Sequence, residues 1–217
     1  MGNPRISNDL SALARQQQII DGLAHDRFSI YPNYFSDELI TALYRELRHH
    51  LRENHLHAAH IGKGQRRMQI QDIRGDSILW LNGESAAQRA YLNEMENLRF
   101  ALNQQLFLGL FELEAHFAHY PPGTGYRKHL DSFQHQNPRR ISTVTYLNPN
   151  WRKGDGGELL IYKEETMIAQ VPPLAGSLVC FLSEDIPHEV AFTHNDRASI
   201  AGWFRVREFD ATPPPCG

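Results

Sequence analysis

The stretch HEVAFTHNDRASIAGWFRV (188–206) contains two β-rich runs on either side of a polar turn at residues 193–196. Short runs of aliphatic and aromatic residues, bounded by Asn, Asp or Gly, are typical of strands in a hairpin. Six similar runs precede this one from residue 112 onward, with turn residues at 121–123, 148–150 and 154–157. The spacing predicts an antiparallel sandwich or barrel that forms a core domain over residues 112–207.

The chain before residue 112 has apolar side chains at helical spacing. We expect helices over 8–25, 36–54 and 85–109, and short strands over 27–35 and 77–82. The first helix should be capped by Ser7 or Asn8, and the second should begin at Ser36. Candidate core positions in the helices are Leu10, Leu13, Ile19, Ile20, Leu23, Leu39, Leu43, Leu47, Tyr91, Met95, Leu98, Leu102 and Leu106.

Helices followed by strands indicate an α+β fold, in which residues 1–111 form a supporting helical region for the sheet. The polar stretch 55–76 is expected to be a loop or an irregular hairpin, and the tail 208–217 is expected to be disordered.

The whole-chain composition narrows the function classes. A length of 217 residues fits one domain with a helical extension, and a net charge of −3 does not favour general nucleic-acid binding. The two cysteines, Cys180 in an apolar run and Cys216 near the end, suit a reducing cytoplasm. We find no signal peptide, no apolar run long enough for a membrane span and no heptad seam, so a monomer away from membranes is expected.

A candidate metal site arises from His129 and Asp131, which we expect on one strand, and from His188, which begins a later strand. Residues two apart on a strand point to the same face, so the imidazole and the carboxylate should lie side by side. Two histidines and one carboxylate leave metal positions open, as in non-haem iron(II) oxygenases. A structural zinc site would instead be closed, usually by cysteines, and no cysteine lies nearby in the sequence.

Arg197 follows His188 by one hairpin, which should fold its side chain back beside the His188 strand. A guanidinium buried in a barrel needs a partner, and a planar carboxylate fits it with two hydrogen bonds. The far carboxylate of 2-oxoglutarate offers such a partner while its 2-oxo acid end chelates a metal. The spacing therefore predicts a site for metal and cosubstrate together.

Two other metal patterns fit less well. His188-Glu189 would begin a zincin motif, but Phe192 stands where that motif needs its second histidine. His55, His57 and His60 could form a second metal cluster, although histidines in a polar loop are more often solvated.

Five stretches carry a resemblance to the 2-oxoglutarate and iron(II)-dependent prolyl hydroxylases, and among them to the hypoxia-inducible-factor prolyl hydroxylases and their bacterial relatives. They are DIRGDSILWLNGE (72–84), AHYPPGTGYRKHLD (118–131), TYLNPNW (145–151), GGELLIY (156–162) and PHEVAFTHNDRASIAGWF (187–204). The IRGD run is not part of the metal pattern, so the likeness goes beyond oxygenases in general. It extends over residues 72 to 207.

The resemblance implies a double-stranded β-helix, a jelly-roll barrel braced by the N-terminal helices. It implies that His129, Asp131 and His188 bind Fe(II), and that Arg197 pairs with 2-oxoglutarate.

The resemblance also assigns residues around these groups. Tyr146 would assist Arg197 in holding 2-oxoglutarate, and Tyr120 would lie beside the cosubstrate. Arg139 and Trp203 would lie on the substrate side, where residues 62–76 would form a loop that closes over the substrate. Ala201 departs from the hypoxia-sensing enzymes, which carry a hydroxyl residue there, and the linker SFQHQNP (132–138) also differs.

The implied activity is that of a dioxygenase that hydroxylates a prolyl residue in a protein, using O2 and releasing succinate and CO2. Ascorbate would stimulate it, and in bacterial relatives the implied target is elongation factor Tu. Two alternatives remain open: an oxygenase that acts on a free amino acid or another small metabolite, and a non-catalytic barrel that serves as a sensor or binding module.

Overall fold

The computed structural model describes residues 4–59, 74–132 and 138–207, with side chains from residue 11 onward. The elements in chain order are α1 (Pro4–Asp26), β1 (Phe28–Tyr31), α2 (Asp37–Arg52), β2 (His57–Ala58), β3 (Ser77–Trp80), α3 (Ala86–Leu106), β4 (Glu112–Tyr120), β5 (Tyr126–His129), β6 (Arg139–Tyr146), β7 (Leu159–Lys163), β8 (Thr166–Val171), β9 (Leu178–Leu182), β10 (His188–Val190) and β11 (Arg197–Arg205).

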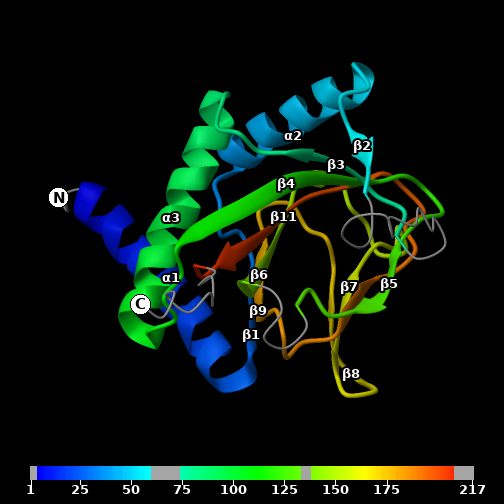
Figure 1. Ribbon diagram of the computed structural model, residues 1–217. Helices are drawn as coiled ribbons and strands as arrows, with labels where there is room; N and C mark the ends of the chain where they lie inside the picture. Colours follow the sequence, from blue (N-terminus) through cyan, green and yellow to red (C-terminus); the bar gives the residue numbers. More distant parts are fainter. Residues whose placement is uncertain (1–3, 60–73, 133–137, 208–217) are drawn as a thin grey trace, which may run out of the picture.

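The strands form two antiparallel sheets, of seven and four strands (Figure 1). The larger sheet has the order β1-β9-β6-β11-β4-β3-β2, and the smaller has the order β5-β10-β7-β8. One apolar cluster draws side chains from both sheets and fills the space between them, and a second joins the helices to the outer face of the larger sheet. The jelly-roll barrel with supporting helices, expected from the sequence, is confirmed.

The period-two pattern of β11 shows how one strand serves both clusters. Ile200 and Phe204 belong to the cluster under the helices, whereas Arg197 and Ser199 point into the interior between the sheets. Successive side chains of a strand point to opposite faces, so a strand covered on both sides can be apolar on one face and polar on the other. The polar face of β11 thus places the Arg197 and Ser199 side chains inside the barrel.

The helices are held by buried apolar stripes and by the expected cap at Ser36. Its hydroxyl accepts a hydrogen bond from Leu39 N at 3.3 Å, and Leu43 and Leu47 of α2 are fully buried. Tyr91, Met95, Leu98 and Leu102 of α3 are also fully buried, as expected.

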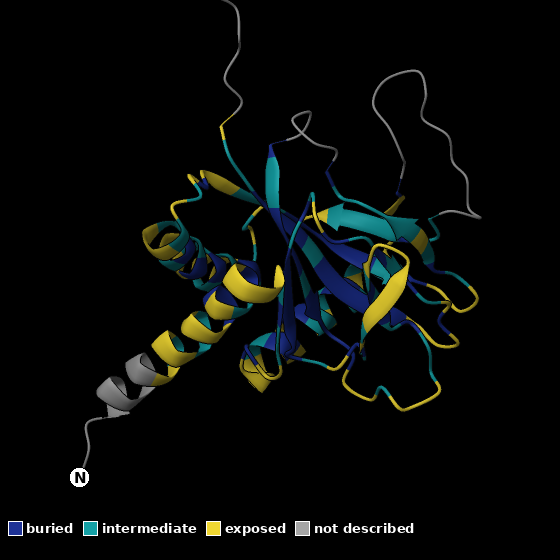
Figure 2. Cartoon of the chain, turned by 90° about the horizontal axis from the view of Figure 1, so that it is seen from below, coloured by how far each residue is buried: buried dark blue, intermediate teal, exposed yellow. Residues whose placement is uncertain are grey.

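The first helix differs from its prediction. It begins at Pro4, so Ser7 and Asn8 lie within it rather than before it. Leu13, expected in the core, is 61% exposed, while Ile19, Ile20 and Leu23 are buried. The described residues of α1 before Ile19 are exposed or only partly buried, as the yellow turns of this helix in Figure 2 show. The helical period indicates which face is apolar but not where the covered surface ends.

Two strand predictions need smaller corrections. The strand expected over 27–35 ends at Tyr31, because the chain turns through Asn33 with a φ of 53°. The strand expected over 77–82 ends at Trp80. His57 and Ala58 pair with β3, in agreement with the irregular hairpin expected there. Residues 60–73 and 208–217, which include most of the expected closing loop and the tail, lie outside the described residues.

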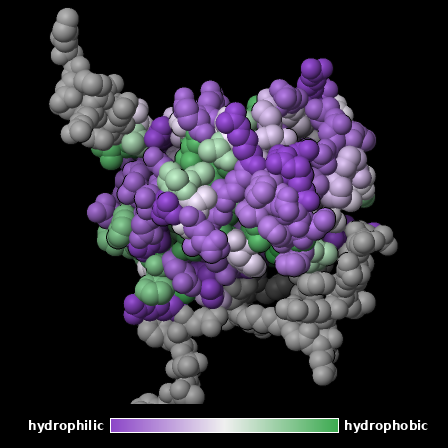
Figure 3. Space-filling view, turned by 90° about the horizontal axis from the view of Figure 1, so that it is seen from above, coloured by the Kyte–Doolittle hydropathy of each residue, from purple (hydrophilic) through white to green (hydrophobic). Residues whose placement is uncertain are grey.

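On the face seen in Figure 3, hydrophobic side chains are scattered among hydrophilic ones. Among the helices that the structure describes, none has the length and apolar character needed to cross a membrane.

Candidate active site

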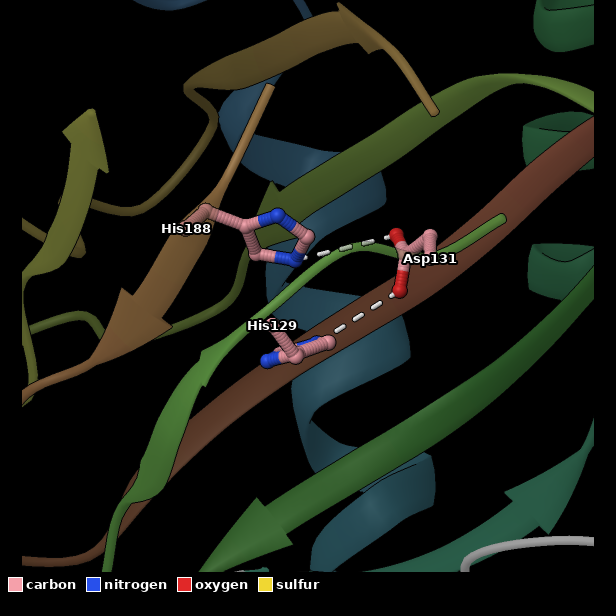
Figure 4. A group of neighbouring side chains, drawn as sticks. All are labelled: His129, Asp131 and His188. Carbon is pink, nitrogen blue, oxygen red and sulfur yellow. Dashed lines mark ion pairs between the residues drawn. The ribbon is translucent and has the colours of Figure 1, made fainter. Parts of the chain in front are cut away.

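His129, Asp131 and His188 converge between the two sheets (Figure 4). Asp131 Oδ1 lies 3.5 Å from His129 Nε2, and its Oδ2 lies 3.7 Å from His188 Nε2. The three potential ligand atoms all lie within 4.8 Å of one another. Within the described ranges this is the one group of three His, Cys, Asp or Glu side chains placed to hold a metal ion. Two imidazoles and one carboxylate form the donor set of non-haem iron(II) sites.

The two histidines face each other as cross-strand partners of β5 and β10. Asp131, however, lies two residues beyond the end of β5, not on the strand as expected. Pro187 precedes His188, and a proline has no N–H with which to extend a ladder past this pair. The carboxylate is held instead by the hydroxyl of Ser142, which donates to Oδ2 at 2.6 Å.

Backbone carbonyls fix the proton on each imidazole. His129 Nδ1 lies 2.7 Å from Arg127 O, and His188 Nδ1 lies 3.1 Å from Ile186 O. A carbonyl oxygen only accepts hydrogen bonds, so each Nδ1 carries the proton and each Nε2 presents a lone pair. The aromatic rings of Tyr126 and Phe181 pack on His129 and His188, with centroids at 3.6 Å and 4.5 Å. The ligand atoms therefore face the site before any metal arrives.

The protonation states also suit a metal. Burial lowers the pKa of His188 to about 4, so this imidazole is neutral at neutral pH. Burial raises the pKa of Asp131, but His188, His129 and the Ser142 hydroxyl together outweigh it and hold this pKa below its ordinary value. A neutral imidazole and an ionised carboxylate are the forms that bind metal ions.

Arg197 is only 3% exposed and is oriented by two hydrogen bonds, from Nε to Gly157 O at 2.7 Å and from Nη1 to Ser199 Oγ at 3.1 Å. The rings of Tyr120 and Tyr146 lie 5.1 Å and 5.2 Å from its guanidinium carbon. In the described part of the chain, no carboxylate forms an ion pair with Arg197, and the buried Tyr146 hydroxyl has no hydrogen-bond partner. A buried guanidinium without an anion fits a ligand that brings a carboxylate.

One cavity of about 520 Å³ joins the main groups of the site. The three candidate metal ligands and Arg197 line it together, as do Tyr120, Arg139 and Trp203, whereas Tyr146 contacts Arg197 but is not part of the cavity lining. A larger cleft of about 660 Å³ lies beside α2 and is lined by none of these residues. Trp80 borders both the cleft and the cavity. The smaller cavity is thus the candidate active site, and it has room for a metal and a small dicarboxylate.

Arg139 and Trp203 form one wall of this cavity. The Arg139 guanidinium lies 3.6 Å from the Trp203 ring centroid and forms an ion pair with Glu114 at 2.7 Å. The Trp203 Nε1 is buried and has no hydrogen-bond partner among the described residues. The wall is thus a cationic group stacked on an aromatic ring, with the ring N–H buried.

Other groups of the site were not assigned from the sequence. Arg74 and Asp76, from the IRGD run, form two hydrogen bonds at 2.7 Å and 3.0 Å in the cavity wall. The two-residue spacing of Arg74 and Asp76 could have indicated from the sequence that they lie side by side. Nothing in the sequence around Ser142 or Tyr126 indicates that they belong to the site. The alternative cluster of His55, His57 and His60 stays a prediction, because residue 60 is outside the described ranges. His55 Nδ1 lies 3.0 Å from His50 Nδ1.

Comparison with known proteins gives a consistent result. Residues 115–205 match the family model of the 2OG-Fe(II) oxygenase superfamily. The human Egl nine homolog 1 is 32% identical over 152 residues, which are 65% of this chain and 34% of that protein. The *Caenorhabditis elegans* hypoxia-inducible factor prolyl hydroxylase is 32% identical over 146 residues, or 62% of this chain and 20% of that protein. The match thus spans 34% and 20% of the length of these two relatives.

Solved structures extend the likeness over nearly the whole chain. A *Pseudomonas putida* prolyl-4-hydroxylase is 40% identical with a TM-score of 0.81, covering 88% of this chain and 99% of that one. A *Trichoplax adhaerens* prolyl hydroxylase, solved with a hypoxia inducible factor peptide fragment, has a TM-score of 0.82 at 24% identity and covers 91% of this chain and 92% of that one. The second likeness concerns the fold alone.

Proposed function

Because the chain belongs to the prolyl hydroxylases of the 2OG-Fe(II) oxygenase superfamily, we propose that it hydroxylates a prolyl residue in a protein. The reaction would consume 2-oxoglutarate and O2 and release succinate and CO2. One oxygen atom would enter the hydroxyl group and the other the succinate carboxylate. The observation that carries the proposal is the shared cavity, in which a two-histidine, one-carboxylate cluster faces a buried arginine without an anion.

The residues divide the task as follows. His129, Asp131 and His188 hold Fe(II), and the metal when bound supplies the oxygen activation and redox chemistry that side chains lack. Arg197 binds the far carboxylate of 2-oxoglutarate, with its plane set by Gly157 and Ser199. The Tyr146 hydroxyl would assist Arg197 in holding this carboxylate, and the Tyr120 ring centroid lies 5.1 Å from the guanidinium carbon.

The substrate side is the wall of Arg139 and Trp203. Its aromatic and cationic groups suit the proline ring of an extended peptide. The relative from Caenorhabditis elegans, which is named as a hypoxia-inducible factor prolyl hydroxylase, supports a polypeptide substrate. We take elongation factor Tu as the first candidate, and ascorbate as a stimulant of turnover.

The decisive experiment incubates the purified protein with Fe(II), 2-oxoglutarate and elongation factor Tu, and then measures succinate and the intact mass of the factor. A gain of about 16 daltons on the factor, absent with His129→Ala and Asp131→Ala, is expected. If succinate forms when free amino acids or metabolites are added, but not when the proteins of a cell extract are added, the small-molecule oxygenase is favoured. Binding of 2-oxoglutarate without succinate formation under any of these conditions would favour the non-catalytic barrel.

A further inference from the structure

Two buried serines form a hydrogen-bonded chain that ends on Asp131. Ser142, on β6, donates to Asp131 Oδ2 at 2.6 Å, and its Oγ lies 2.9 Å from the Oγ of Ser183. The two serines are 1% and 0% exposed. They approach Asp131 from the larger sheet, on the side away from the two histidines' strands.

The chemistry of the groups sets the direction of this chain. An ionised carboxylate only accepts hydrogen bonds, so the single hydroxyl proton of Ser142 goes to Asp131. The contact between the serines is then donated by Ser183. Each hydroxyl polarises the next, which strengthens the bond that reaches the carboxylate.

Ser183 is itself fixed by the backbone on both sides. Its N–H donates to Arg140 O at 3.0 Å, and its carbonyl accepts from Ser132 N at 3.2 Å. The second contact ties the residue after Asp131 to the end of β9. Because Asp131 lies beyond β5, no ladder of β5 positions it, and these contacts supply the missing support.

We propose that Ser142, aligned by Ser183, is a positioning residue for the metal ligand Asp131. By engaging Oδ2, it sets the rotation of the carboxylate and places Oδ1 on the His129 side. Hydrogen-bond partners of metal ligands typically change metal affinity by about 10- to 100-fold when removed. The inference rests on the metal site of the proposed function, with which it shares Asp131.

The test is titration of the purified apoprotein with Co(II), followed by the visible spectrum of the bound ion and by calorimetry. Ser142→Ala is expected to raise the Co(II) Kd by about 10- to 100-fold and to alter the spectrum. Ser142→Thr, which keeps the hydroxyl on a strand position, is expected to stay within about threefold of wild type. Ser183→Ala, which removes only the aligning donor, is expected to fall between them.

Ser132→Ala is the matched control. Ser132 is also buried and adjoins Asp131, but its hydroxyl has no hydrogen-bond partner in the described structure. The same change in volume there should leave the Co(II) Kd and spectrum unchanged.

The outcomes separate the explanations. Equal Kd values for wild type and Ser142→Ala, or an equal loss in Ser132→Ala, would overturn the proposal. If Ser142→Ala does not fold, an unchanged Kd in Ser183→Ala overturns it and a raised Kd supports it. A wild-type protein that fails to bind Co(II) would refute the proposed metal site, which is a different failure from an insensitive Ser142.

Discussion

His129 and His188 are paired across β5 and β10, and each points its Nδ1 at the backbone carbonyl two residues before it. The last residue of one strand and the first of the other thus present matching imidazoles. This arrangement sets the tautomer of both rings without any other side chain. The metal ligands are therefore oriented by the backbone of the barrel itself.

Removal of a ligand should abolish metal binding but not folding. His129→Ala and Asp131→Ala are each expected to weaken Co(II) binding by more than about 100-fold, because a three-ligand site loses a donor. Calorimetric titration measures this, and circular dichroism checks the fold. His25→Ala, which removes an exposed histidine of α1, serves as the control. Wild-type affinity in either ligand variant would contradict the site.

Tyr146→Phe should separate cosubstrate binding from stability. The buried hydroxyl has no partner in the described structure, so its removal is expected to leave the apoprotein as stable as wild type, or more stable by about 1–3 kcal/mol. The 2-oxoglutarate Kd of the Co(II)-loaded protein should rise by about tenfold, because a hydrogen bond to a carboxylate is lost. Urea unfolding and calorimetry give the two quantities.

Tyr91→Phe is the matched control for this prediction. Tyr91 is equally buried, but its hydroxyl bonds to Thr145 Oγ1 at 3.3 Å under the helices. Its removal should lower stability and leave 2-oxoglutarate binding unchanged. The prediction for Tyr146 fails if both variants behave alike.

Gly157→Ala should displace Arg197. A Cβ at position 157 would lie 2.9 Å from Arg197 Cδ and 3.1 Å from Thr193 Oγ1, with a φ of +77°. The 2-oxoglutarate Kd is expected to rise by about tenfold or more while the Co(II) Kd stays at its wild-type value.

Gly109→Ala separates this steric effect from backbone strain. Gly109 has a similar φ of +66°, but nothing lies within 4 Å of its Cβ position. The variant should lose about 1 kcal/mol of stability and bind 2-oxoglutarate normally. A cosubstrate defect in Gly109→Ala would show that strain alone, rather than contact with Arg197, is responsible.

Arg139→Ala should affect the protein substrate more than the cosubstrate. The side chain lies on the Trp203 ring in the cavity wall, so its loss should raise the KM for elongation factor Tu by about tenfold and change the 2-oxoglutarate KM by less than about threefold. Arg140→Ala is the control, because the neighbouring arginine instead pairs with Glu184 at 2.7 Å. Equal effects of the two variants would remove Arg139 from the substrate side.

His116 should make stability depend on pH. Burial, with the nearby charge of Arg74, lowers the pKa of His116 from 6.5 to about 4. Between these values the unfolded chain binds a proton that the folded protein excludes. His116 therefore leaves the free energy of unfolding unchanged above about pH 6.5. It lowers this free energy by about 3 kcal/mol as the pH drops toward 4, with no further change at lower pH.

The measurement is urea unfolding of wild type and His116→Gln at about pH 7.5 and about pH 4.5. The variant should lose less stability than wild type over this interval by about 2.5 kcal/mol. His188 also has a lowered pKa and contributes in both proteins, so only the difference between them reports on His116. Parallel losses would show that His116 does not contribute.

The sequence predicted what depends on residue type and chain order. His129, Asp131, His188 and Arg197 have distinctive chemistry and line one cavity, as expected. The hairpin expected between His188 and Arg197 was wrong, because β10 and β11 pair with other strands and lie in different sheets. Ser142 escaped prediction because a serine on a strand has no distinctive spacing, and its partners Asp131 and Ser183 come from elsewhere in the chain. The placement of Asp131 on a strand was wrong because strand length depends on the partner strand, which begins after a proline.

The chain passes from the smaller sheet to the larger between β10, which begins at His188, and β11, which begins at Arg197. The proposed metal and cosubstrate sites are thus joined by one short segment of chain, and a displacement of this segment would move both His188 and Arg197. Thermodynamic linkage then requires reciprocity: the factor by which bound metal tightens 2-oxoglutarate must equal the factor by which 2-oxoglutarate tightens the metal. Retention of the metal would accordingly rise and fall with the supply of the oxo acid.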